Sequence, residues 1–295
     1  MEMADIIKFG VILPSYGKQA NRLPIVDTAN LAESLRFDSV WTTDHLALPH
    51  SESDRFPRLF ESISTVAYLA GITRHIKLGI SALVLPQRHP FEVAREMATI
   101  DVLSGGRTLL AVGIGWSEGE YQNLGYNFHN RGRRMDEAVK VLRTCWRGRE
   151  VVSFQGEFYS FDQAYFSPLP LQEGGPPLWV AGNSAPALRR AINLADGWHP
   201  TNIRAADLKR ATSQFTPLIK ARPFTVCCRL RLSYNADSGA QLSGSSDQII
   251  YQLKEYVDAG MNYALLHFDG DSQAERQRAM QRFATDIAPA FKELD

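Results

Sequence analysis

The sequence predicts an α/β protein built as one closed (β/α)8 TIM barrel, and three observations point to it. Short runs rich in β-branched and aromatic residues alternate along the chain with stretches whose apolar residues follow helical spacing. Eight such units are present, which fits a single barrel better than two doubly wound domains. A chain of 295 residues also buries a large core without disulfides or metals. We therefore expect residues 1–295 to form one domain.

The eight expected strands are apolar on both faces for most of their length, as buried parallel strands should be. They lie near residues 6–13, 37–42, 76–84, 107–113, 177–181, 195–199, 224–232 and 262–268. Helices with an apolar stripe are expected around 135–146, 249–257 and 280–291, where they would pack against the sheet. The sixth helix, around 204–220, has a weaker pattern.

One stretch, residues 148–177, departs from the alternation. Its VVSFQGEFYSF segment predicts two short strands around Gln155 and Gly156, and four prolines follow before residue 178. We expect this stretch to be an insertion after the fourth helix that lies over the barrel.

The charges of the chain cancel, with 32 Lys and Arg against 32 Asp and Glu. A neutral chain has no overall field to attract nucleic acid or an anionic membrane, and no apolar run approaches the roughly 18 residues of a membrane helix. The three cysteines form no CxxC pair, and the acidic start lacks the basic region of a signal peptide. We expect a cytoplasmic protein that acts on a small-molecule substrate and binds neither nucleic acid nor membrane.

In a (β/α)8 barrel the chemistry lies at the C-terminal ends of the strands, so the residues that end each run are the candidates. Asp44 and His45 follow the second strand, where an imidazole can exchange a proton with a substrate near neutral pH. A histidine that only forms local hydrogen bonds is the simpler interpretation of this pair. Gly113 and Gly115 end the fourth strand without the GxGxxG spacing of a dinucleotide site. They either satisfy a turn or let a flat ring approach the backbone.

A possible phosphate site precedes the helix that begins near residue 185. Gly182, Asn183 and Ser184 lie there, and free amides at a helix start suit an anion. Asn or Ser at this place is equally an ordinary helix cap.

Four tryptophans fall at or near strand ends, which suits a pocket for a planar ligand, although core packing explains them as well. They are Trp41, Trp116, Trp179 and Trp198. The chain has no GxxxxGK[ST], HExxH, GxSxG or zinc-knuckle spacing, and we predict no metal site.

Several segments, taken together and in this order, carry a resemblance to a known family. They are FGVILP, FDSVWTTDH, IKLGISALVLPQRHP, ATIDVLSGGR, LLAVGIGW followed by Glu120-Tyr121, RGRRMDE, PPLWVAGNS and ADGWHP. Along nearly its whole length the chain resembles the bacterial luciferase-like superfamily of flavin monooxygenases and deazaflavin oxidoreductases. It is most similar to the branch that uses coenzyme F420, an 8-hydroxy-5-deazaflavin, in place of FMN. The resemblance implies a (β/α)8 barrel with an insertion, usually dimeric, that holds the ring at the strand ends.

The resemblance also implies roles for individual residues. His45 matches the family histidine near the reactive edge of the ring, and Asp44 matches a neighbouring contact to the deazaflavin. Ser81 and Ala82 match a bulge in the third strand, often with a cis peptide bond, that backs the ring.

Two glycine-containing turns complete these implied cofactor contacts. Gly113 and Gly115 match the glycines beside the ring. Gly182, Asn183 and Ser184 match the turn that binds the cofactor phosphate.

The chain departs from the family at one position that bears on the substrate. Members that oxidise sugar phosphates carry a glutamate general acid where this chain has Trp116, and an indole cannot donate that proton. Glu118 or Glu120 would have to replace it. We therefore expect a more apolar, aromatic substrate in a pocket formed by Tyr16, Trp116, Trp198, His199 and His267.

The function expected from this resemblance is hydride transfer between C5 of F420 and a small organic substrate, in a homodimeric enzyme whose His45 handles the proton. An FMN-dependent monooxygenase that uses molecular oxygen is the first alternative. A barrel that binds a cofactor without catalysis is the second.

Overall fold

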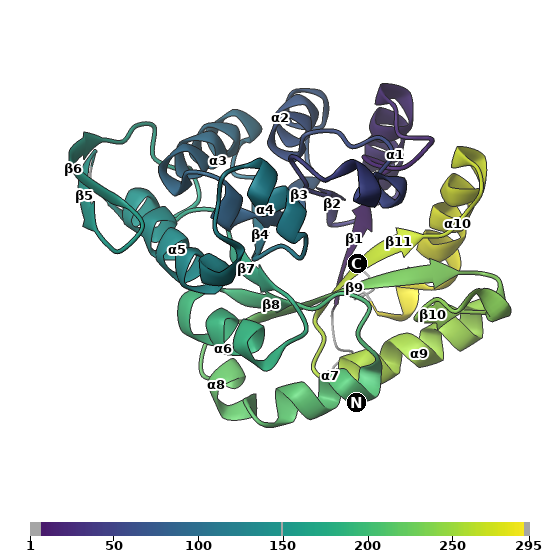
Figure 1. The fold of residues 1–295 in the computed structure, drawn as a ribbon. Coiled ribbons are helices and arrows are strands. Elements are labelled where there is room, and N and C mark those ends of the chain that lie inside the picture. Colours follow the sequence, from purple (N-terminus) through teal and green to yellow (C-terminus); the bar gives the residue numbers. More distant parts are fainter. Residues whose placement is uncertain (1–6, 149, 292–295) are drawn as a thin grey trace.

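The computed structural model describes residues 7–148 and 150–291, and it contains the expected barrel (Figure 1). Residue 6, the first of the expected opening strand, and residue 149 of the expected insertion lie outside the described residues. The barrel strands are β1 (Lys8–Ile12), β2 (Ser39–Thr42), β3 (Lys77–Val84), β4 (Thr108–Gly113), β7 (Leu178–Ala181), β8 (Gly197–His199), β9 (Thr225–Ser233) and β11 (Tyr263–Phe268). Each pairs in parallel with the next, and β9 joins both β8 and β11, which closes the sheet. The (β/α)8 prediction is confirmed.

Helices surround the strands, and their bounds follow local sequence signals. They are α1 (Arg22–Ser34), α2 (Ser62–Ile72), α3 (Pro90–Ser104), α4 (Glu118–Asn123), α5 (Arg131–Arg147), α6 (Ala185–Leu194), α7 (Ala205–Ser213), α8 (Thr216–Lys220), α9 (Ser246–Asp258) and α10 (Gln273–Asp286). Ser245 and Ser272 begin α9 and α10 with capping boxes. No helix among residues 7–148 and 150–291 is long and apolar enough to cross a membrane.

Two helix predictions need correction. The weakly patterned stretch 204–220 forms two short helices, α7 and α8, and the second has Pro217 in its first turn, where proline is tolerated. The last helix ends at Asp286 instead of continuing to 291, because a proline at 289 disfavours helical geometry in the residue before it. Phe291 still packs on the sheet, with its ring 6.1 Å from that of Phe9.

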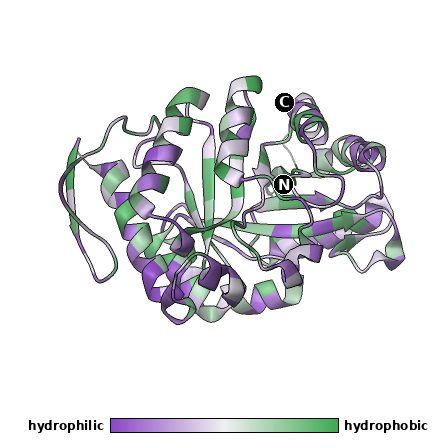
Figure 2. Ribbon diagram, turned by 45° about the horizontal axis from the view of Figure 1, so that its top comes forward, coloured by the Kyte–Doolittle hydropathy of each residue, from purple (hydrophilic) through white to green (hydrophobic). Residues whose placement is uncertain are grey.

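The barrel has an inner and an outer core, because successive strand residues face opposite sides of the sheet. Figure 2 shows hydrophobic residues along the central strands. The inner core contains Ile12, Trp41, Leu109, Ala111, Trp179, Cys227, Tyr263 and Leu265. The indoles of Trp41 and Trp179 stack there with ring centroids 5.1 Å apart. Gly79 on β3 makes room for them, since a Cβ at that position would collide with the Trp41 indole.

The predicted insertion contains a separate antiparallel hairpin, visible at the left edge of Figure 1. Its strands are β5 (Val151–Gln155) and β6 (Ser160–Tyr165). One carboxylate on α5 holds the turn: Glu137 accepts hydrogen bonds from the amides of Glu157, Phe158 and Tyr159 at 2.6–2.8 Å. The two expected strands around Gln155 and Gly156 are therefore present. A two-residue strand that was not expected, β10 (Leu242–Ser243), pairs with β9.

Candidate functional site

A cavity of about 540 Å³ lies at the C-terminal ends of the barrel strands. We call it the site cavity. Its wall contains Tyr16, Thr43, Asp44, His45, Phe56, Ser81, Ala82, Val84, Gly113, Ile114, Gly115, Trp116, Ala181, Gly182, Thr201, Asn202, Arg229, Arg231 and His267. The structure thus brings together most of the predicted site residues, and Asn183, Ser184, Trp198 and His199 are the exceptions. A volume of a few hundred Å³ or more is typical of sites for small molecules and cofactors.

His45, just beyond β2, is held by a buried carboxylate from α4. Its Nδ1 lies 2.9 Å from Oε2 of Glu120, while Oε1 of the same carboxylate accepts from the amides of Leu46 at 2.6 Å and Ala47 at 3.1 Å. Because the carboxylate accepts, Nδ1 carries the proton, and Nε2 is left for a ligand. Ser117 caps α4 and accepts from the Glu120 amide at 3.0 Å, which places this carboxylate at the helix start.

The environment of Glu120 favours its charged form. Burial raises the pKa of this carboxyl group, but the hydrogen bond and charge of His45 and the two amide hydrogen bonds outweigh burial, so the net pKa is lowered. Two aromatic rings enclose the imidazole. The ring of His45 lies 4.7 Å from that of Phe56 and 5.6 Å from that of Trp116. Of the two glutamates considered for the site, Glu120 contacts His45, whereas Glu118 is exposed and lies 3.8 Å from His129.

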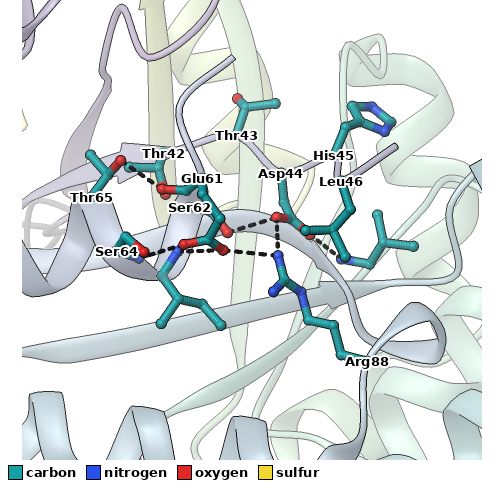
Figure 3. Close-up of polar contacts among 12 residues, drawn as sticks. Thr42, Thr43, Asp44, His45, Leu46, Glu61, Ser62, Ser64, Thr65 and Arg88 are labelled. Atoms are coloured by element: carbon teal, nitrogen blue, oxygen red, sulfur yellow. Dashed lines mark hydrogen bonds and ion pairs between the residues drawn. The ribbon is translucent and has the colours of Figure 1, made fainter. Parts of the chain in front are cut away.

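Asp44, although adjacent to His45, is tied into the protein (Figure 3). Its Oδ1 accepts from Ser62 Oγ and Arg88 Nη2, both at 2.7 Å, and its Oδ2 accepts from the Val84 amide at 2.9 Å. Arg88 also reaches Glu61 at 3.0 Å. These bonds join the end of β2 to the start of α2 and to the end of β3. The carboxylate therefore has a structural role, and its contact with a cofactor stays a prediction.

One side of the site cavity has almost no side-chain bulk. The Ser81–Ala82 peptide bond is cis, and the pairing of β3 with β4 shifts register there, as the resemblance implied. Gly113 lies between the methyl groups of Ala82 and Ala181, since a Cβ built on it would be 3.7 Å from each. Ala82, Gly113, Ala181 and Gly182 have side chains no larger than a methyl group, and we call these four residues the small-residue wall. Gly115 has φ +69°, a left-handed conformation that glycine adopts without strain.

A second part of the site cavity wall is polar and comes from β9 and β11. Alternation along β9 places Arg229 and Arg231 on the same inner face as Cys227. His267 ends the inner face of β11, and burial together with the charge of Arg229 lowers its pKa to about 4. Arg229 and Arg231 were not among the predicted site residues, although the alternating RLRL segment at a strand end was a usable signal.

Two predicted pocket residues are buried outside the wall of the site cavity, and their role in a substrate pocket stays a prediction. Trp198 points outward from β8 into the outer core, and its Nε1 donates to the Gly182 carbonyl at 2.7 Å. His199 points inward but lies beneath Ser81, whose hydroxyl is 2.8 Å from its Nε2, while its Nδ1 donates to the Cys227 carbonyl. Burial lowers the pKa of His199 to about 4. Adjacent residues of a regular strand face opposite sides of the sheet, which is why Trp198 enters the outer core while His199 faces the barrel interior.

The predicted phosphate turn lies at the edge of the site cavity, which it reaches through Gly182. Asn183 exchanges two hydrogen bonds with the backbone of Thr201, at 2.8 and 2.9 Å. Ser184 caps α6 by accepting from the Ala187 amide at 3.4 Å. Both side chains are exposed, and phosphate binding at this turn stays a prediction.

Most of the chain matches a known protein family. Residues 7–238 match the family described as luciferase-like monooxygenase. The chain belongs to the luciferase-like monooxygenase family. The matched span carries every residue of the site cavity wall except His267. The resemblance seen in the sequence is confirmed.

Relatives of this luciferase-like protein include enzymes with two kinds of cofactor. It is 26% identical to an F420-dependent glucose-6-phosphate dehydrogenase of Rhodococcus hoagii, over 99% of this chain and all of that one. It is 30% identical to the oxygenase component of a flavin-dependent trigonelline monooxygenase of Acinetobacter baylyi, over 53% of this chain and 42% of that one. These relatives are named as dehydrogenases and monooxygenases, so the predicted class of luciferase-like oxidoreductase is confirmed.

Solved structures share the luciferase-like barrel. An F420-dependent secondary alcohol dehydrogenase, solved with an F420-acetone adduct, superimposes with a TM-score of 0.82 at 18% identity, over 98% of this chain and 100% of that one. EDTA monooxygenase from Chelativorans sp. BNC1 superimposes with a TM-score of 0.78 at 15% identity, over 97% and 93%. At these identities the likeness concerns the fold.

Proposed function

We propose that this protein is an F420-dependent oxidoreductase that transfers a hydride between C5 of the deazaflavin and a small organic substrate in the site cavity. The observation that carries the proposal is the position of His45, fixed by Glu120 in the same cavity as the small-residue wall. The full-length similarity to F420-dependent glucose-6-phosphate dehydrogenases supports this choice of cofactor.

The small-residue wall fits a planar ring system. Ala82, Gly113, Ala181 and Gly182 present nothing larger than a methyl group along one side of the site cavity. A flat ring can therefore approach the strand ends closely there. A bound deazaflavin supplies the two-electron hydride chemistry, and the protein supplies binding, orientation and proton handling.

Proton handling belongs to His45 in this proposal. Its Nε2 takes the proton of a substrate hydroxyl during oxidation, or returns one during reduction. Glu120 keeps the proton on Nδ1 and stabilises the imidazolium that forms when Nε2 gains a second proton. The two aromatic neighbours, Phe56 and Trp116, limit the access of water to the imidazole.

An FMN-dependent monooxygenase is the second candidate, favoured by the similarity to the trigonelline monooxygenase component. A third candidate, a barrel that binds a cofactor without catalysis, gives no reason for a buried carboxylate bonded to a cavity histidine.

Titration of the purified protein with F420 and, separately, with FMN distinguishes these candidates. We expect saturable quenching of the deazaflavin fluorescence and weaker or no binding of FMN. A preference for FMN contradicts the proposal and supports oxygen chemistry. Saturable F420 binding without turnover of any alcohol or activated alkene in a broad panel supports the non-catalytic barrel.

A further inference from the structure

The site cavity contains a guanidinium without a carboxylate partner. Arg229 projects from β9 into the site cavity. Among the described residues no Asp or Glu oxygen lies within 4.0 Å of it. The other charged residues of the wall are paired, since Arg231 lies 2.7 Å from Asp269 and Asp44 lies 2.7 Å from Arg88. The wall therefore has one uncompensated positive charge.

Neutral protein groups hold this guanidinium in place. Nη1 of Arg229 donates to the Ser81 carbonyl at 2.8 Å, and Nη2 donates to the Tyr16 hydroxyl at 3.3 Å. A guanidinium has five N–H donors, and these bonds leave donors on it for a ligand. A planar, fixed set of donors matches the geometry of a carboxylate better than that of a neutral group.

The surroundings of Arg229 do not supply a negative charge. His267 stays neutral near pH 7, because burial and the charge of Arg229 lower its pKa to about 4. His199, beneath the Ser81 hydroxyl, is neutral for the same reason of burial. Glu120 lies at His45, where its oxygens already accept from the imidazole and two amides. A partly buried cation in this setting gains most from an anion brought by the ligand.

The wall of the site cavity also contains three aromatic rings, those of Tyr16, Phe56 and Trp116. Phe56 and Trp116 flank His45, and the ring of Tyr16 lies 5.2 Å from that of Phe56. A ligand between these rings and Arg229 would combine an apolar body with one anionic end.

Resting on the proposed function, we propose that the substrate of this enzyme is an apolar carboxylic acid whose carboxylate binds Arg229 while its apolar part packs on Phe56 and Trp116. The small-residue wall would hold the cofactor ring next to this carboxylate, since Arg229 bonds to Ser81, the residue before Ala82. This proposal adds a carboxylate to the more apolar, aromatic substrate expected from the sequence, an expectation that relied partly on Trp198.

The test uses benzoate and benzamide, which have the same shape and differ in charge. Calorimetric titration of the full-length protein without cofactor should show benzoate binding at least about tenfold more tightly than benzamide. Arg229→Gln should abolish this preference while leaving the weaker benzamide affinity unchanged. Arg133→Gln is the control: it removes an exposed, paired cation on α5, outside the site cavity wall, so benzoate binding should change less than about threefold.

Four outcomes overturn the proposal. They are equal affinity for the two probes, no benzoate binding by the parent protein, unchanged benzoate binding by Arg229→Gln, and competitive displacement of benzoate by F420, which would assign Arg229 to the cofactor. If Arg229→Gln does not fold, Arg229→Lys decides, because it keeps the charge without the planar fork and should retain part of the preference. The probes are titrated without cofactor, so a failure to bind F420 overturns the proposed function and not the carboxylate site.

Discussion

Nδ1 of His45 and Oε2 of Glu120 lie 2.9 Å apart although the residues are 75 positions apart in the chain. His45 lies just beyond the end of β2, and Glu120 lies in α4, the short helix after β4. The barrel brings both to the same end of the sheet, where the carboxylate fixes the tautomer of the imidazole. This pair gives the first two predictions.

Removal of the imidazole should reduce turnover much more than cofactor binding. We expect His45→Ala to lower kcat by about 10²–10⁴, the usual contribution of a general acid or base, because no other group would take the proton. The F420 dissociation constant, measured by fluorescence, should change only a few fold. Unchanged turnover would show that His45 does not handle the proton.

Glu120→Gln should lower both stability and turnover. The lowered pKa of Glu120 means that its stabilising contribution is present above its unfolded pKa and disappears as the pH falls through the folded value. The variant should therefore be less stable than the parent at pH 7, by about 1–3 kcal/mol, and the difference should shrink below about pH 4.

Urea unfolding of both proteins across this pH range tests the stability prediction. The variant should also show a lower kcat, because an amide oxygen holds the Nδ1 proton of His45 less firmly than a carboxylate does. Equal loss of stability at pH 7 and at low pH would contradict the assignment of a charged Glu120.

The buried histidines should make the fold sensitive to mild acid. His199 and His267 each have a pKa near 4, mainly through burial, against about 6.5 in an unfolded chain. The unfolded state therefore binds more protons between these values, and stability falls as the pH falls from about 6.5 to 4, by on the order of 3 kcal/mol for the fully buried His199 and by less for the half-buried His267. Urea unfolding of His199→Gln should show a smaller loss over this window than the parent. Parallel curves would contradict the prediction.

A methyl group on the small-residue wall should weaken cofactor binding without unfolding the protein. In Gly113→Ala the new Cβ meets only ordinary contacts at 3.7 Å, so the free energy of unfolding should change by less than about 1 kcal/mol. The F420 dissociation constant should rise at least tenfold if the ring lies against this wall. Gly79→Ala is the contrasting variant: its Cβ collides with Trp41 in the inner core, so stability should fall by about 1–3 kcal/mol.

The barrel was predictable because each unit carries its own signal. The strands lie within about two residues of their expected positions, since buried parallel strands are continuous apolar runs and turns bound them. The short strand β10 was missed because two residues carry no recognisable pattern.

The site was predictable only to the level of which residues lie at strand ends. Trp198 and His199 both lie at the end of β8, but which of them faces the barrel interior depends on the register of that strand. Knowing where a strand ends does not fix its register. Whether Glu118 or Glu120 replaces the general acid missing at Trp116 could not be decided from the sequence, because the side chain that enters the site depends on the turn that begins α4. Arg229 was passed over, although alternation from Cys227 would have placed it inside the barrel.

The hydrogen bond from Arg229 to the Ser81 carbonyl joins the polar side of the site cavity to the small-residue wall. A ligand that draws the guanidinium away from this carbonyl breaks a hydrogen bond that holds the backbone beside the small-residue wall. A ligand that moves this backbone would in turn move the guanidinium. Thermodynamic reciprocity then requires that each ligand alter the affinity of the other by the same factor. We expect the binding of substrate and cofactor to be coupled. A substitution at Arg229 that changes which substrate charge is preferred should therefore also change the affinity for the cofactor.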